Sequence, residues 1–269
     1  MAREAVEGCR RLAARVGSTP ALRALLRLRY ERQFRNWPGA FRGVYTSFEE
    51  AIRSAPPGKI GYDYPELASA YRNRLEPSTS EYPVMFWLQR AFDEGARSVF
   101  DYGGHVGLAF YAFGKRMRFP PDLVWRVCDL PNMVEQGRAF AGQQGASALS
   151  FTTQRADADG SDVLCAQGSL QYMEEPLTQT LLALARPPQH LLINQVPLSD
   201  GPSFVTLQNT IYVYNPYTVF NRRAFLAGLQ VLGYELVDSW RTPELAVRIP
   251  FYPEHRLESY SGVYLRRTA

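Results

Sequence analysis

The fold of this sequence is most constrained by a series of short apolar runs that alternate with helical stretches after Gly95. Strands that alternate with helices indicate a mostly parallel sheet that is covered by helices on both faces. We therefore expect an α/β domain whose ligands bind beyond the carboxyl ends of its strands. The runs that predict strands are residues 98–102, 123–128, 148–151, 163–167, 190–196, 234–240 and 262–266.

The length of 269 residues suits one main α/β domain with an N-terminal extension. We place a helical and irregular extension over residues 1–82 and the main domain over residues 83–269. In the extension, residues 1–35 predict two short helices that are broken at 17–20, and a further helix is expected near 47–53.

Arginine dominates the charge of residues 1–35, where nine arginines accompany three glutamates. Two interpretations of this segment stay open. It could make a peripheral contact with a membrane surface. Alternatively, an amphipathic helix pair packs on the main domain or on a second subunit of a homodimer.

Charge and cysteine content exclude several classes of function. The formal net charge is only +4, so no nucleic-acid partner is expected. Cys9, Cys128 and Cys165 are far apart and form no cluster with metal-ligand spacing, so we expect no metal site and a reducing compartment. No apolar run approaches the roughly 20 residues that span a bilayer, and no signal-peptide pattern is present, so we expect a cytoplasmic protein.

The sharpest local signal is a strand that ends at Asp101 and runs into a glycine-rich turn with Gly103, Gly104 and Gly107. Glycine lets a ligand approach the backbone, although such turns also occur as plain structural punctuation. A dinucleotide site would place glycine where Asp101 stands, whereas an acidic strand end suits a cationic ligand. S-adenosylmethionine, which carries an ammonium and a sulfonium group, is the predicted ligand of these four residues.

The second signal is the strand that ends at Asp129, which is followed by Leu130. A carboxylate can accept hydrogen bonds from both ribose hydroxyls of an adenosine, and the end of the second strand is where such sheets place one. We predict that Asp129 and Leu130 bind the nucleoside part of the cofactor. The alternative is that Asp129 caps a helix over residues 132–141.

The third signal is the run over residues 163–167, which is followed by a small polar turn. Ser169 is predicted to contact the cofactor, while Gln171 and Tyr172 are candidates for positioning a substrate. Tyr172 could act as an acid or base only if its pKa of about 10 were lowered.

Together these signals resemble the class I S-adenosylmethionine-dependent methyltransferases, over roughly residues 83–266. More narrowly, the sequence is similar to a family of bacterial methyltransferases that often accompanies surface-polysaccharide genes. The resemblance implies a Rossmann-like fold with a mostly parallel seven-stranded sheet, and S-adenosylmethionine as the cofactor. The narrower resemblance covers most of the chain from Trp37 on, and the segments that carry it are the Asp-x-Gly-Gly-x-x-Gly loop, 37–41 with Ala51, 169–172 with 175–176, 215–222 and 233–240.

One residue departs from the pattern of that class, because His105 replaces the middle glycine of the usual Gly-x-Gly-x-Gly loop. His105 is a candidate general base, since its ordinary pKa lies near neutrality. The alternative is a loop histidine that bonds backbone or caps the following helix.

The acceptor side is predicted from later segments. Asn194 and Gln195 lie near the functional end of their strand, and residues 197–220 form a long connection. Its Tyr212 and Asn215 could belong to a lid over the acceptor, or the segment could be a β-hairpin.

Methyl transfer mainly requires an aligned acceptor and exclusion of water. The sequence therefore predicts a metal-independent O-methyltransferase that acts on a small-molecule or saccharide acceptor, and N-methylation stays open. The alternatives are another nucleotide-dependent enzyme, such as a dehydrogenase, and a binding protein with a vestigial cofactor pocket.

Overall fold

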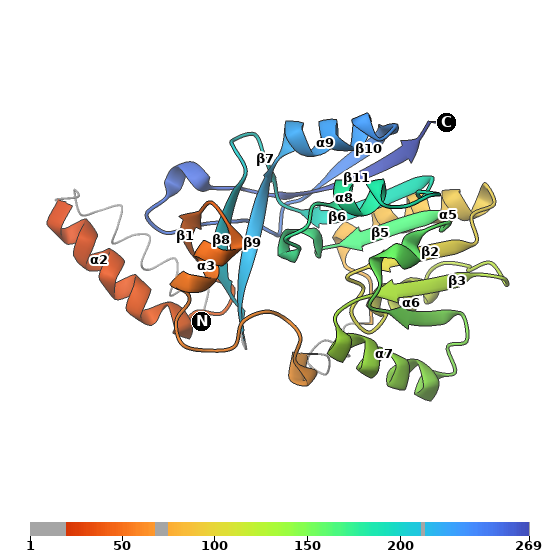
Figure 1. Ribbon diagram of the computed structural model, residues 1–269, viewed down its shortest axis with the longest axis horizontal. Helices are drawn as coiled ribbons and strands as arrows, with labels where there is room; N and C mark the ends of the chain where they lie inside the picture. The colour runs from red at the N-terminus through yellow and green to blue at the C-terminus, as the bar shows by residue number, and fades with distance from the viewer. Residues whose placement is uncertain (1–19, 68–74, 211–212, 269) are drawn as a thin grey trace. The chain divides into compact units, whose positions relative to one another are not determined.

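The computed structural model describes residues 20–67, 75–210 and 213–268. The chain divides into two compact units (Figure 1). The first contains the chain up to Gly61 together with Val205–Tyr217 and Arg248–Arg256. The second contains Tyr62–Phe204, Thr218–Val247 and the chain from Leu257 on.

This division differs from the predicted boundary after residue 82, because the unit with the large sheet already begins at Tyr62. The first unit also recruits residues 205–217 and 248–256 from the C-terminal half of the chain. Pairing between distant segments leaves no local trace in a sequence. Compactness is not the same as independent folding, so the domain boundary stays a prediction.

The second unit is built on a seven-stranded sheet, and all seven predicted strands are present in it. The strand order is β10-β11-β6-β5-β2-β3-β4. Strand β11 is antiparallel to both of its neighbours, β10 and β6, and all pairs from β6 to β4 are parallel. The predicted mostly parallel, Rossmann-like sheet is therefore confirmed. The strands are β2 (Ser98–Tyr102), β3 (Val124–Cys128), β4 (Leu149–Thr152), β5 (Val163–Gln167), β6 (His190–Val196), β10 (Tyr234–Thr242) and β11 (Tyr260–Arg267).

The strand order reverses at β2, and this reversal positions the site. The chain runs outward from β2 through β3 to β4 and then returns to β5 on the other side of β2. Connections therefore leave β2 and β5 in opposite directions, which opens a crevice beyond their carboxyl ends. Asp101 lies in this part of β2, next to the glycine-rich turn.

Helices cover both faces of this sheet, as predicted. Successive residues of a strand point to opposite faces, so Val99 packs in one core and Phe100 in the other. Each large apolar side chain that is fully buried in this way stabilises the fold by roughly 1.5–3 kcal/mol. The helices on the face of Val99 are α5 (Tyr82–Asp93), α6 (Leu108–Gly114) and α7 (Pro131–Gln144), and those on the face of Phe100 are α8 (Leu177–Leu182) and α9 (Arg222–Val231).

The first unit has a smaller core around the aromatic residues of its helix α2 (Pro20–Gln33). Tyr30 and Phe34 pack there with Leu207 and Tyr214. Its other elements are β1 (Phe41–Tyr45), α3 (Phe48–Ser54), β8 (Phe204–Asn209) and β9 (Tyr214–Asn221), in which β1, β8 and β9 are neighbouring strands in that order.

Two predictions for the extension can be compared with this unit. The helix expected near residues 47–53 is α3, whose N-terminus is capped by the Ser47 hydroxyl. The second of the two N-terminal helices is α2, while residues 1–19 lie outside the described residues. None of the described helices has the length and apolar composition needed to cross a membrane.

The connection over residues 197–220 is largely regular, because β8 and β9 occupy most of it as adjacent strands, and its predicted role as a lid over the acceptor stays a prediction. Their turn is closed by a hydrogen bond from the Thr210 N–H to the Val213 carbonyl. The last residues of β9 belong to the second unit, where Phe220 and Asn221 pair with β7 (Leu198–Ser199). The β-hairpin alternative is the one that the structure adopts.

Candidate functional site

Asp101 is a buried carboxylate at the end of β2. Its side chain is only 1% exposed, and the Trp125 Nε1–H donates to its Oδ2 at 3.2 Å. Loss of hydration in this environment raises the pKa of Asp101 from 3.8 to about 7. A carboxylate in such a place gains much from a cation that binds beside it.

The backbone of the glycine-rich turn lies directly against this carboxylate. A Cβ added at Gly104 would overlap the Asp101 carboxyl group and come within 2.8 Å of its Oδ1. Gly104 is thus required by close approach, whereas Gly107 is required by its backbone angle φ of +88°. Any ligand held by Asp101 must therefore also meet the backbone of this turn.

Gly103 joins the turn to the segment that follows β5. Its φ is +79°, and a Cβ there would overlap Ser169. The Ser169 hydroxyl donates to the Tyr102 carbonyl at 2.6 Å, and the Gly103 N–H donates to the Cys128 carbonyl at 2.8 Å. Ser169 therefore holds the end of β2 in place. The sequence predicted only a contact with the cofactor for this residue.

Asp129, at the end of β3, supports the same turn from the other side. Its two oxygens accept from the backbone N–H groups of His105 and Leu130, each at 2.7 Å. Loss of hydration raises the pKa of Asp129 to about 6, and these hydrogen bonds oppose that rise. Since each carboxylate oxygen has a second lone pair, Asp129 can still accept from a ligand.

The alternative role for Asp129, capping the following helix, is filled by another residue. Helix α7 begins at Pro131, and the Asn132 N–H donates to the Asp63 carboxylate at 2.8 Å. Asp63 precedes this helix by almost 70 residues, so no local pattern could have identified it. Asp129 instead accepts from the backbone of the glycine-rich turn, and the described lining of the hollow does not include it.

His105 shows why glycine is usual at its position. Its φ is +58°, a left-handed conformation that few side chains adopt without strain, although histidine tolerates it better than most. The hydrogen bond from its N–H to Asp129 helps to hold that conformation. The predicted general base thus sits in the turn itself.

A hollow in the second unit lies beside the glycine-rich turn. It is bordered by Asp101, Gly103, Gly104 and His105, and four further polar side chains complete its wall. Within the described part of the chain, the lining includes three carboxylates and neither lysine nor arginine. The hollow therefore favours a cationic ligand over an anionic one. The four further polar residues are Glu76, Glu81, Gln167 and Gln195.

Two of the lining carboxylates were not predicted. Glu81 accepts hydrogen bonds from the Ser78 N–H and hydroxyl, each at 2.6 Å, in a capping box that precedes α5. The Ser-x-x-Glu spacing is visible in the sequence and could have identified this helix start. Glu76 pairs with Lys115 and Arg116, and no sequence signal indicates that pairing.

The predicted substrate-positioning residues Gln171 and Tyr172 lie in a short 3-10 helix, Leu170–Tyr172. Gln171 is buried, and its Nε2 donates to the Gly168 carbonyl at 2.8 Å. Its Oε1 has no hydrogen-bond partner among the described residues. The ring of Tyr172 meets that of Tyr62 edge-on, with 4.9 Å between their centroids. The described lining of the hollow includes neither Gln171 nor Tyr172.

The adjacent side chains of Asn194 and Gln195 lie in different surroundings. The Asn194 side chain is buried, donates to the Ser80 carbonyl at 3.1 Å and accepts from the Trp240 Nε1–H at 2.9 Å. It therefore holds three elements together. Gln195 borders the hollow, with its Nε2 donating to the Ser80 hydroxyl at 3.0 Å.

The remaining predicted substrate residues lie elsewhere. Asn215 is buried in β9 within the first unit, and its Nδ2 has no hydrogen-bond partner among the described residues. Tyr212 lies outside the described residues. Their role in acceptor binding stays a prediction.

Comparison with known proteins identifies the fold. The sequence matches no protein-family model and no curated protein. A 1,6-didemethyltoxoflavin-N1-methyltransferase from Burkholderia thailandensis, solved with 1,6-didemethyltoxoflavin and S-adenosylhomocysteine, is similar in structure. The two chains are 19% identical, the alignment covers 76% of this chain and 86% of that chain, and the TM-score is 0.50.

A further solved structure, a S-adenosylmethionine-dependent methyltransferase from Clostridium acetobutylicum, is 8% identical, with a TM-score of 0.49. That alignment covers 76% of this chain and 98% of the other chain. At the identity of the Burkholderia protein, structural similarity establishes a shared fold and no more. The fold of the second unit is therefore the Rossmann-like class I methyltransferase fold.

Proposed function

We propose that the second unit binds S-adenosylmethionine in the crevice beyond β2 and transfers its methyl group to a small-molecule acceptor. The observation that carries this proposal is the buried Asp101 carboxylate, which lies against Gly104 in a hollow lined by further carboxylates. The ammonium group of the cofactor would supply the cation that Asp101 lacks.

The charge of the hollow also separates this proposal from a dehydrogenase. A dinucleotide brings a pyrophosphate to the turn after the first strand, where backbone N–H groups must meet an anion. Here Asp101 and Glu81 line the hollow beside that turn, and their carboxylates would repel a pyrophosphate. The third carboxylate, of Glu76, is already paired with Lys115 and Arg116. The two other carboxylates favour a ligand with cationic groups.

The nucleoside part fits the end of β3. Asp129 can accept hydrogen bonds from ribose hydroxyls through the lone pairs that its backbone partners leave. Leu130 is 41% exposed and would pack against the adenine ring. The two predicted nucleoside-binding residues thus offer complementary chemistry.

When bound, the cofactor supplies an electrophilic methyl group on its sulfonium. His105 borders the hollow and would accept the proton of an acceptor hydroxyl at an imidazole nitrogen, while the hydroxyl oxygen bonds to the methyl carbon and the carbon–sulfur bond breaks, its electron pair remaining on sulfur. Gln195 would orient the acceptor. Gln171, outside the lining of the hollow, has an Oε1 that no described residue engages in a hydrogen bond. We infer metal-independent O-methylation from this arrangement.

Several finer features rest on the sequence. We propose a saccharide-type acceptor from the resemblance to methyltransferases of surface-polysaccharide gene clusters. We also propose a cytoplasmic location, and either a homodimer or a peripheral membrane contact through the arginine-rich N-terminal segment.

The substitution Asp129→Asn tests the nucleoside half of the site. Binding of adenosine should weaken by about 10- to 100-fold, because a charge-assisted hydrogen-bond acceptor for the ribose is lost. Binding of 2′,3′-dideoxyadenosine, which lacks both hydroxyls, should change by less than about threefold. Calorimetric titration of the wild type and the variant with both nucleosides measures this difference.

The matched control is Asp122→Asn, which removes an exposed carboxylate just before the opposite end of β3. It should leave both affinities unchanged. An equal loss for adenosine and its dideoxy analogue would mean that Asp129 acts only by shaping the turn, and the ribose contact would be rejected.

A further inference from the structure

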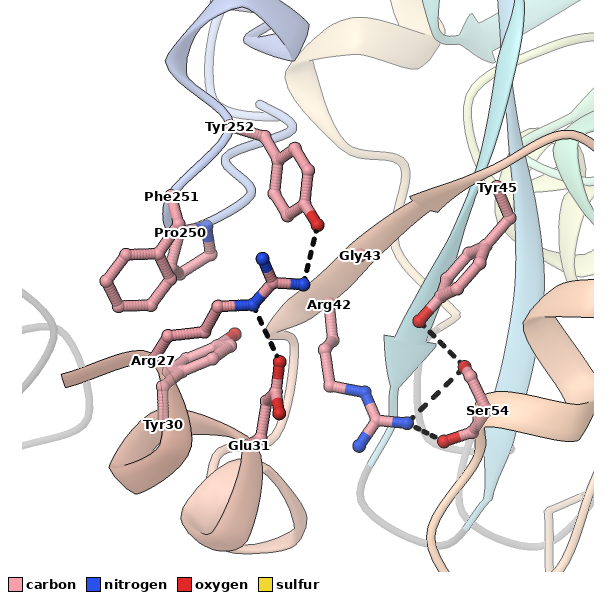
Figure 2. Close-up of a pocket in the computed structure, with 10 residues that line it drawn as sticks. All are labelled: Arg27, Tyr30, Glu31, Arg42, Gly43, Tyr45, Ser54, Pro250, Phe251 and Tyr252. Atoms are coloured by element: carbon pink, nitrogen blue, oxygen red, sulfur yellow. Dashed lines mark hydrogen bonds and ion pairs between the residues drawn. The ribbon is translucent and has the colours of Figure 1, made fainter. Parts of the chain in front are cut away.

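The first unit contains a cavity of its own, about 250 Å³ in volume. Figure 2 shows two arginines, Arg27 and Arg42, that reach into it from α2 and β1. Tyrosines and the aromatic residue Phe251 form much of the remaining wall. Nothing in the proposed methyl transfer uses this cavity.

The charge of Arg42 is not balanced by a carboxylate. Its Nη2 donates to the carbonyl and the hydroxyl of Ser54, the last residue of α3 (Figure 2). Its guanidinium also lies over the Phe34 ring, 5.0 Å from the centroid. Among the described residues no hydrogen bond or ion pair engages its Nε or Nη1, so the three N–H groups of these two nitrogens are left as donors.

Arg27 differs from Arg42 because its charge is already paired. Its Nε donates to Glu31 and its Nη2 to the Tyr252 hydroxyl, each at 2.9 Å. Glu31 is the one acidic residue in the described lining of the cavity. Two arginines and one glutamate leave the cavity with excess positive charge, and this excess is centred on Arg42.

Capping of α3 explains only part of this arrangement. The bonds from Arg42 to Ser54 satisfy the C-terminus of that helix and use Nη2 alone. They also fix the plane of the guanidinium, which leaves the other donors preorganised for two oxygens of a carboxylate or phosphate. The helix end thus acts as the support of Arg42.

An aromatic side chain lies close to Arg42 in this cavity (Figure 2). Tyr45 turns back along β1 into the cavity, and its hydroxyl accepts from the Ser54 hydroxyl at 2.7 Å. Gly43 permits this fold, because a Cβ there would overlap the Tyr45 ring. Tyr45 therefore offers a flat apolar surface next to the donors of Arg42, since both side chains contact Ser54.

We propose that this cavity is a binding site for a small organic anion, in which a carboxylate or phosphate pairs with Arg42 and a planar body lies against Tyr45. The proposal goes beyond the methyl-transfer function and does not depend on it. Its chemistry requires both parts of the ligand. Inorganic phosphate alone has no apolar body, and a neutral aromatic molecule has no partner for the guanidinium.

Calorimetric titration with 2-naphthoate, 2-naphthyl phosphate and neutral 2-naphthol tests this proposal on the full chain. At least one of the two anions should bind the wild type at least tenfold more tightly than 2-naphthol does. The stronger anion identifies carboxylate or phosphate as the source of the charge. Arg42→Gln should weaken the binding of that anion at least tenfold, because a charge-assisted hydrogen bond is lost.

Two further variants make the result specific. Arg29→Gln removes the same charge from an exposed position of α2 outside the cavity and should change the affinity less than twofold. Arg42→Lys keeps the charge without the planar fork and should bind with intermediate affinity. The proposal is overturned if neither anion binds the wild type, if 2-naphthol binds as tightly, or if folded Arg42→Lys or Arg42→Gln binds like the wild type.

Discussion

Replacing Asp101 with asparagine should abolish most of the affinity for the cofactor while making the ligand-free protein more stable. The ammonium group of S-adenosylhomocysteine loses its buried charged partner, which should weaken binding by at least about 100-fold. In the free protein, by contrast, the substitution removes a carboxylate whose pKa burial raises from 3.8 to about 7. At pH 8 an ionised Asp101 costs the free protein up to about 4 kcal/mol.

The sign of the pH dependence follows from that raised pKa. The folded state holds the Asp101 proton more tightly than the unfolded state does. The protonated Asp101 therefore stabilises the folded state fully below about pH 4, and this stabilisation is lost as the pH rises through about 7. The free energy of unfolding of the ligand-free wild type should therefore fall over this range relative to Asp101→Asn.

Denaturant unfolding and calorimetric titration between pH 5 and pH 8 measure both effects. Wild-type affinity for S-adenosylhomocysteine should increase as Asp101 ionises, with Asp129 contributing near its own pKa of about 6. The asparagine variant should lack the increase near pH 7. A variant that binds as tightly as the wild type would show that Asp101 does not hold the ammonium group.

Replacing Gly104 with alanine should destabilise the protein and weaken cofactor binding together. The added Cβ would overlap the Asp101 carboxyl group, so either the turn or the carboxylate must move. Overpacking of this kind costs about 1–3 kcal/mol. Cofactor affinity should fall more than tenfold, because the backbone of the turn and Asp101 can no longer meet the ligand together.

A double-mutant cycle isolates the cause of this loss. In an Asp101→Ala background, the carboxyl group that the alanine would meet is absent, so Gly104→Ala should cost less than about 0.5 kcal/mol. His105→Asn is a control at the next position. It should leave the free energy of unfolding nearly unchanged, because asparagine also tolerates a left-handed φ. If Gly104→Ala costs the same free energy in the wild-type background as in the Asp101→Ala background, the overlap with the Asp101 carboxyl group would not be the cause of the loss.

The sequence was most informative about the strands of the large sheet. The predicted bounds of β2, β5 and β6 agree with the structure, because each strand is a short apolar run bounded by polar or turn residues. The strands β8 and β9 were not predicted as such. Pro216 lies inside β9, and proline usually argues against a strand, so the tyrosine-rich segment also suited a loop.

In the site, residues close together in the sequence were predictable and distant partners were not. The proximity of Asp101 to Gly104 follows from a strand that ends in a glycine-rich turn. Asn194 appeared equally suited to a ligand, yet Ser80 and Trp240 occupy its polar atoms from 114 and 46 residues away. Such partners depend on tertiary packing, which no local pattern of residues specifies.

By this proposal, the crevice beyond β2 selects a cationic nucleoside cofactor. Titration of the wild-type protein with S-adenosylhomocysteine and, separately, with NAD tests it most directly. We expect S-adenosylhomocysteine to bind at micromolar concentrations, and NAD to bind at least about 100-fold more weakly because its pyrophosphate meets the carboxylates of the hollow. Tight binding of NAD together with no binding of S-adenosylhomocysteine would contradict the account.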